Sequence, residues 1–150
     1  MAITFLKTTN NLGGAATASE TDGSDLFDVF TDTETTDGVT VYACIVLDTD
    51  VAYSNARIFI DSETTHANVN WSLGLGNAAI NATEQTIADE ETAPGSVTFT
   101  DSEGLANALN IGNMAINDTK AFWVRCVVSA GALAKDSFTF SLKTAGGIGE

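Results

Sequence analysis

The sequence contains few of the residues that most catalytic and metal sites require. Its 150 residues include one histidine, two cysteines and one proline, and no apolar run is longer than a strand. The absence of a long apolar run excludes a helix that spans a bilayer. The scarcity of histidine and cysteine leaves almost no ligands for zinc or haem. We therefore expect no cofactor and no metal site built on these residues.

Basic residues are also scarce, since 6 lysines and arginines face 20 aspartates and glutamates, a net charge of −14. Nucleic acid and anionic membranes are polyanions, so both are excluded as direct partners. A hydrophobic fraction of 44% is too high for a disordered acidic tail. The length suits one domain, residues 1–150. A halophilic host is an alternative explanation for so acidic a surface.

The two cysteines, Cys44 and Cys126, both lie in strongly apolar segments. Buried free thiols behave as small hydrophobic groups, and this is the predicted state of both residues. A disulfide between them stays open, because spacing alone does not decide it. The first seven residues, MAITFLK, lack the charged and apolar regions of a signal peptide, so we expect a protein made in the cytoplasm.

Alternation with period two dominates the sequence. Phe138, Phe140 and Leu142 fall on one face of a strand and Thr139 and Ser141 on the other, which predicts a half-buried antiparallel strand. Similar segments rich in Val, Ile, Thr and aromatic residues bring the total to about eight predicted strands, at residues 3–7, 39–47, 56–61, 69–75, 97–100, 108–111, 122–128 and 137–143.

Helical signals are weak by comparison. Residues 80–91 could hold a turn or two of helix, and residues 26–30 a short strand or a 3₁₀ turn. Many short strands without a long helix predict an all-β fold, an antiparallel β-sandwich of jelly-roll-like type. We expect an extended N-terminal arm and a flexible, glycine-rich tail at residues 145–150.

Two stretches of the chain resemble each other at an offset of 36 residues. LGLGNAAINAT at residues 73–83 parallels LNIGNMAINDT at residues 109–119. Two copies are too few for a repeat architecture. We interpret them as two strands that each leave their sheet through a similar Gly-Asn turn. The alternative is an internal similarity between the two sheets of the fold.

No motif predicts an enzyme. His66, the only imidazole, lies in a polar segment without a partner for nucleophilic catalysis. The many carboxylates are typical of solvated loops. The acidic pairs in residues 22–25 and 48–50 offer oxygens for calcium but match no EF-hand loop, so solvated turns are favoured. We predict no catalytic, cofactor or metal residues.

Two of the predicted strands are apolar on both faces, whereas a sandwich strand normally alternates apolar and polar residues. The second faces carry Tyr42 in residues 39–47, and Trp123 and Arg125 in residues 122–128. Either a long loop of the chain covers these faces, or a partner protein does, since Trp, Tyr and Arg are common interface anchors. With Phe59 and Trp71, they form the predicted interface residues.

Several segments resemble a group of small virion proteins of tailed bacteriophages. They are LKTTNNLGG at 6–14, LFD at 26–28, GVTVYAC at 38–44, NATEQTIADEETAP at 81–94 and FWVRCVVSAGA at 122–132. The group is similar to capsid decoration, or cement, proteins. The resemblance implies a β-sandwich on the outer surface of the head shell, commonly a homotrimer, whose partner is the major capsid protein.

The leading hypothesis is therefore a structural virion protein that binds the outer capsid surface and stabilises the head. A tail, collar or fibre component is one alternative. A carbohydrate-binding module is another, in which Tyr53, Trp71 or Trp123 would stack on a sugar beside a calcium ion.

Overall fold

We analysed a computed structural model, which describes residues 3–23, 26–27, 31–63, 68–131 and 140–148. Strands make up most of the regular structure. In chain order the elements are β1 (Ile3–Thr8), the 3₁₀ turn η1 (Thr9–Asn11), β2 (Ala16–Glu20), α1 (Asp32–Asp37), β3 (Val39–Thr49), β4 (Tyr53–Glu63), β5 (Val69–Leu75), the 3₁₀ turn η2 (Leu105–Asn107), β6 (Leu109–Met114), β7 (Thr119–Val128) and β8 (Phe140–Ile148).

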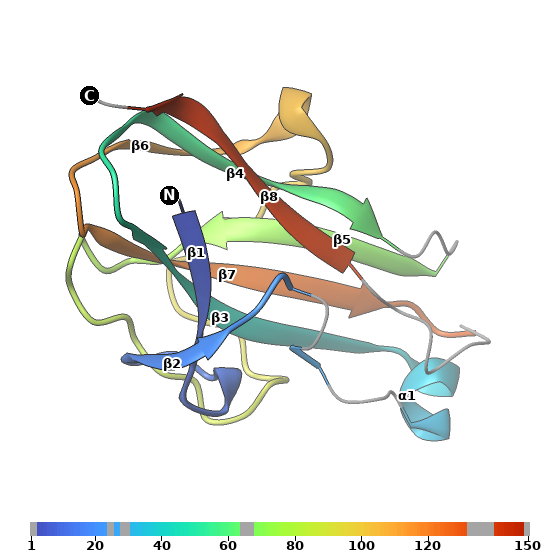
Figure 1. The fold of residues 1–150 in the computed structure, drawn as a ribbon. Helices are drawn as coiled ribbons and strands as arrows, with labels where there is room; N and C mark the ends of the chain where they lie inside the picture. The colour runs from blue at the N-terminus through green and yellow to red at the C-terminus, as the bar shows by residue number, and fades with distance from the viewer. Residues whose placement is uncertain (1–2, 24–25, 28–30, 64–67, 132–139, 149–150) are drawn as a thin grey trace.

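The strands form two antiparallel sheets. The larger has the order β2-β1-β3-β7-β5 and the smaller the order β6-β4-β8, and Figure 1 shows the smaller sheet lying over the larger one. The longest pairing joins β3 to β7, from Val39 opposite Val128 to Asp48 opposite Thr119. The all-β, antiparallel, sandwich-like fold predicted from the sequence is confirmed.

The main core lies between the two sheets. Alternate residues of β3 and β7, including Ile45 and Phe122, face it from the larger sheet, and Ile58 and Ile60 of β4 face it from the smaller one. Each of these four side chains is at least 98% buried. The predicted alternation thus decides which side of each central strand enters this core.

A second cluster lies on the opposite face of the larger sheet. Cys44 and Val46 of β3 join Ala121 and Trp123 of β7 there, and Ile87 covers them from outside the sheet. The apolar second faces predicted for residues 39–47 and 122–128 are confirmed. What covers them is residues 76–101, called here the covering segment, which links β5 to η2.

Two local predictions need correction. Residues 97–100 are no strand, and only Thr100 forms a bridge, to Leu73. The covering segment carries turns where a short helix over residues 80–91 was considered.

Two elements were not predicted. They are β2 and α1, and the first turn of α1 is closed by a capping box between Thr31 and Glu34. Leu26 is buried and Phe27 half-buried, while residues 28–30 of that predicted element lie outside the described chain.

The first and last strands of the chain, β1 and β8, both pair with neighbouring strands. β1 is an internal strand of the larger sheet, paired with β2 on one side and β3 on the other. This corrects the expected extended arm. Ala145, Gly147 and Ile148 pair with β4 as part of β8, where the sequence predicted a flexible tail.

Candidate functional site

The two tryptophans predicted as interface anchors are buried inside the chain. Trp71 is 1% exposed in the main core, where Phe27 packs 6.0 Å away between ring centroids. Trp123 is fully buried in the second cluster. Tyr53, the third residue of the hypothetical sugar platform, is 5% exposed. None of the three offers a surface on which a partner or a sugar could stack, so these predictions are corrected.

The other predicted interface residues are half-buried. Tyr42 and Arg125 are paired neighbours on β3 and β7, and both contact Phe99 of the covering segment. The ring centroids of Tyr42 and Phe99 are 5.6 Å apart, and the Arg125 guanidinium lies 4.9 Å from the Phe99 ring. Phe59 lies apart from them, on β4. Of the two covers considered for this face, the chain's own loop is the one found.

Backbone contacts hold the covering segment to the sheet. Ile87 N donates to Leu12 O at 2.9 Å, and Tyr42 N donates to Glu90 O at 2.7 Å. Gly13 approaches the segment so closely that an added Cβ would lie 2.1 Å from Gln85 O, and its φ is 100°. Only glycine fits this conformation and this distance together. The covering segment is therefore fixed at both the β1–β2 connection and β3.

A buried carboxylate anchors the start of the covering segment. Glu84 is 4% exposed. Its Oε1 accepts from Ala78 N at 2.8 Å, and its Oε2 accepts from Asn77 N at 3.1 Å and from Trp123 Nε1 at 3.0 Å. A buried charge is tolerated when donors surround it in this way. Glu84 thus joins the covering segment to the central strand β7.

The cysteines lie on opposite faces of the larger sheet. Cys44 belongs to the second cluster and Cys126 to the main core. Both are buried free thiols, as predicted, and residues on opposite faces of one sheet point away from each other. Burial, followed by the charge of Glu84, raises the pKa of the Cys44 thiol far above its usual range. Cys44 stays protonated and inert in the folded protein.

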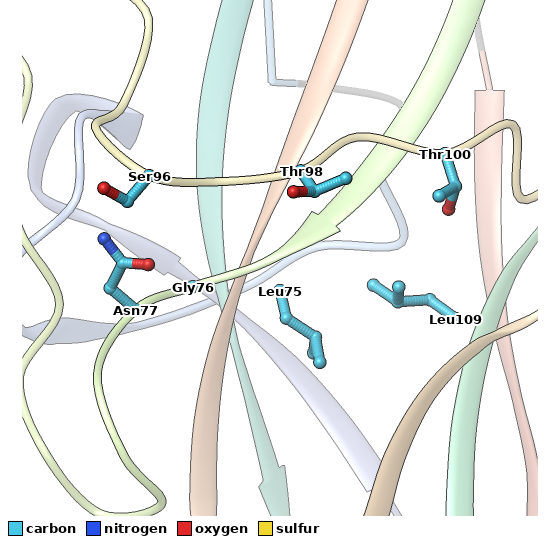
Figure 2. Close-up of a pocket in the computed structure, with 7 residues that line it drawn as sticks. All are labelled: Leu75, Gly76, Asn77, Ser96, Thr98, Thr100 and Leu109. Atoms are coloured by element: carbon cyan, nitrogen blue, oxygen red, sulfur yellow. The ribbon is translucent and has the colours of Figure 1, made fainter.

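A cleft of about 400 Å³ lies where the covering segment passes the end of β5. Leu75 and Leu109 form its apolar part, and Ser96, Thr98 and Thr100 line the opposite side (Figure 2). The hydroxyl groups come from alternate residues of one extended stretch, whose intervening residues Val97 and Phe99 pack toward the second cluster. The arrangement combines neutral polar and apolar surface without an ionisable side chain in its lining.

The two similar stretches of sequence form similar turns. Ala82 N donates to Ala79 O at 2.9 Å, and Asp118 N donates to Ala115 O at 3.1 Å. Both turns have a left-handed asparagine at the third position, Asn81 with φ 69° and Asn117 with φ 67°, as type II turns require. The shared geometry lies in the Ala-Ile-Asn part of each stretch, not at the Gly-Asn pair that the sequence suggested. We call residues 79–82 and 115–118 the twin turns.

The strands before the twin turns lie in different sheets. β5 belongs to the larger sheet and β6 to the smaller. The second position of each turn is an isoleucine, and both are exposed: Ile80 at 37% and Ile116 at 61%. Neither residue stood out in the sequence, although the repeated AIN triplet marks both.

The acidic residues and the histidine considered as ligands do not form a metal cluster within the described structure. No cluster of three or more His, Cys, Asp or Glu side chains suited to a metal occurs among the described residues. His66 and two of the residues at 22–25 lie outside the described chain. Within the described part, no helix has the length and apolar character needed to cross a membrane.

Comparison with known proteins adds no relative. No model of a known protein family matches the chain, and no curated protein matches it significantly in sequence.

Proposed function

We propose that this chain is a structural virion protein of the capsid decoration type, which binds the outer surface of a bacteriophage head and stabilises it. The sequence segments similar to such proteins support the proposal. So does the architecture: a sandwich-like body with a second cluster closed by the chain's own covering segment. The proposed partner is the major capsid protein, and self-association as a homotrimer is part of the same proposal.

The observation that carries the proposal is the contrast between the acidic body and its exposed apolar side chains. Ile80 and Ile116 stand exposed on connections between strands of a chain with a net charge of −14. Exposed apolar side chains favour binding to another protein. The charge disfavours contact with the packaged nucleic acid, and so favours the outer surface of the shell.

An add-back assay tests the proposal. Purified chain is mixed with expanded phage heads that lack it, and the heads are then sedimented. We expect the chain to sediment with the heads and to raise the temperature at which they release DNA, because each bound copy buries surface across subunit junctions. Heads that already carry the protein are the control, since their sites are occupied. Chain that stays in the supernatant with empty heads would refute the proposal.

A further inference from the structure

We propose that the twin turns form the contact surface through which this chain binds its partner, with Ile80 and Ile116 inserting into an apolar recess bordered by lysine or arginine side chains. This inference rests on the proposed function, and takes the partner to be a shell protein. It assigns the contact to one end of the molecule, where the connections β3–β4 and β6–β7 lie opposite α1 (Figure 1).

The first argument is that the two turns are held together as one unit. Asn81 N donates to Thr119 O at 2.8 Å, and Thr119 N donates to Asn81 Oδ1 at 2.9 Å. Asn81 Nδ2 also donates to Asp118 Oδ1 at 2.8 Å. A single asparagine of the first turn thus bonds to the side chain of Asp118 in the second turn and to the backbone of Thr119, the residue that follows it. The two isoleucines therefore stand on neighbouring turns with a fixed backbone, which lowers the entropy lost on binding.

The second argument is that the turns are rigidly connected to the sheets. Asn117 N donates to Thr49 O at 2.8 Å, and Thr49 N donates to Asp118 O at 3.2 Å. Lys120 Nζ donates to Gly76 O at 3.1 Å and also to Ala78 O. The end of β3, the start of β7 and the covering segment thus all support the twin turns. This support carries two exposed apolar side chains, Ile80 and Ile116.

The third argument identifies the partner by charge. Asp48 and Asp50 flank Thr49, which is bonded to the second turn, and Asp118 lies within that turn. These three carboxylates outnumber the one lysine of the same group, Lys120, whose Nζ donates to Gly76 O and Ala78 O. In a two-fold symmetric contact, a second copy of this chain would bring the same acidic residues to the contact and would be repelled. A recess with basic residues at its border is complementary in charge.

The test measures the affinity of the whole chain for expanded heads that lack it. The double variant I80A/I116A should bind at least about tenfold more weakly, since truncation of an anchoring side chain commonly costs that much. The matched control is L105A, which truncates an equally exposed side chain on η2, at a different part of the surface. L105A should bind like the wild type.

A second pair of variants tests the rigidity of the unit. Asn81→Gly keeps the positive φ but removes the three side-chain hydrogen bonds to Asp118 and Thr119, and should weaken binding several-fold. Asn117→Gly makes the same change in the other turn, where the asparagine side chain donates and accepts no hydrogen bond among the described residues. It should leave the affinity unchanged.

Each outcome decides between the two proposals. If the wild type binds heads and I80A/I116A binds equally well, the inference fails and the proposed function stands. If the wild type does not bind, both fail. Binding should weaken as salt rises, because the charges at the border are screened, and stronger binding at high salt would contradict a basic border. If I80A/I116A instead dissociates an oligomer of the isolated chain, the partner is a second copy and the inference is wrong.

Discussion

Cys44 lies beneath the covering segment, in the same cluster as Trp123. Its pKa is raised first by burial and then by the negative charge of Glu84. The thiolate is the reactive form of cysteine, so this residue is protected from oxidation and metal binding as long as the segment stays in place. Its role is to fill space among the apolar side chains of the second cluster.

Folding stability should therefore fall at alkaline pH in a way that depends on Cys44. The unfolded thiol ionises near its ordinary pKa of 9.0, while the folded one stays protonated. The contribution of Cys44 to the free energy of unfolding is thus fully present below pH 9. Above pH 9 this contribution falls by about 1.4 kcal/mol per pH unit. Urea unfolding of wild type and C44A between pH 8 and 11 measures this. The stability of the wild type should fall more steeply, and parallel curves would contradict the assignment.

At the scale of elements, the covering segment is the feature that sequence periodicity could not locate. The strands β3 and β7 were predicted with their faces correctly assigned, because alternation is local. Either a loop of the chain or a partner protein could have covered their apolar second faces. The loop could not be identified from the sequence, because its residues follow no hydrophobic period. Its contacts come from isolated residues, such as Ile87 and Phe99, and from the carboxylate of Glu84, which the sequence does not distinguish from solvent-exposed acidic residues.

Other elements were detectable but missed. The sequence Thr31-Asp32-Thr33-Glu34 has the spacing of a capping box, which marks the start of α1, but no helix was predicted there. β2 is an edge strand whose residues are mostly exposed, so it lacks a hydrophobic pattern. The twin turns were visible as a repeat, but the sequence alone could not bring Asn81 against Thr119, since that contact depends on the sheet topology.

Glu84 should be the strongest single anchor of the covering segment. Its replacement by alanine removes the acceptor of the buried Trp123 indole N–H and of two part-buried backbone N–H groups, and we expect a loss of about 2–3 kcal/mol in the free energy of unfolding. E84Q should also destabilise, by about 1 kcal/mol or more, because both carboxylate oxygens accept hydrogen bonds and an amide presents a donor to one of these groups.

The matched control is E91A, which removes the same charge from an exposed position of the covering segment and should change stability by no more than about 0.5 kcal/mol. Chemical denaturation followed by tryptophan fluorescence measures all three variants, since Trp123 is itself a partner of Glu84. Equal stabilities of E84A and E91A would show that the carboxylate does not hold the segment.

At the scale of the whole molecule, which has a net charge of −14, the charged and the apolar side chains occupy different places. The apolar residues fill two clusters, one between the sheets and one under the covering segment. The carboxylates keep the outside hydrated, which suits a protein displayed at high density. The exposed isoleucines of the twin turns are exceptions to this division, which is why they mark the proposed contact.

The most direct test of the decoration proposal is the copy number of this chain in purified virions, measured by quantitative mass spectrometry against the major capsid protein. A decoration protein covers the shell, so the account predicts copies in a fixed ratio to the shell subunits and of comparable number. A few copies per virion would indicate a tail or collar component, and the absence of the chain from virions would contradict a structural role in the particle altogether.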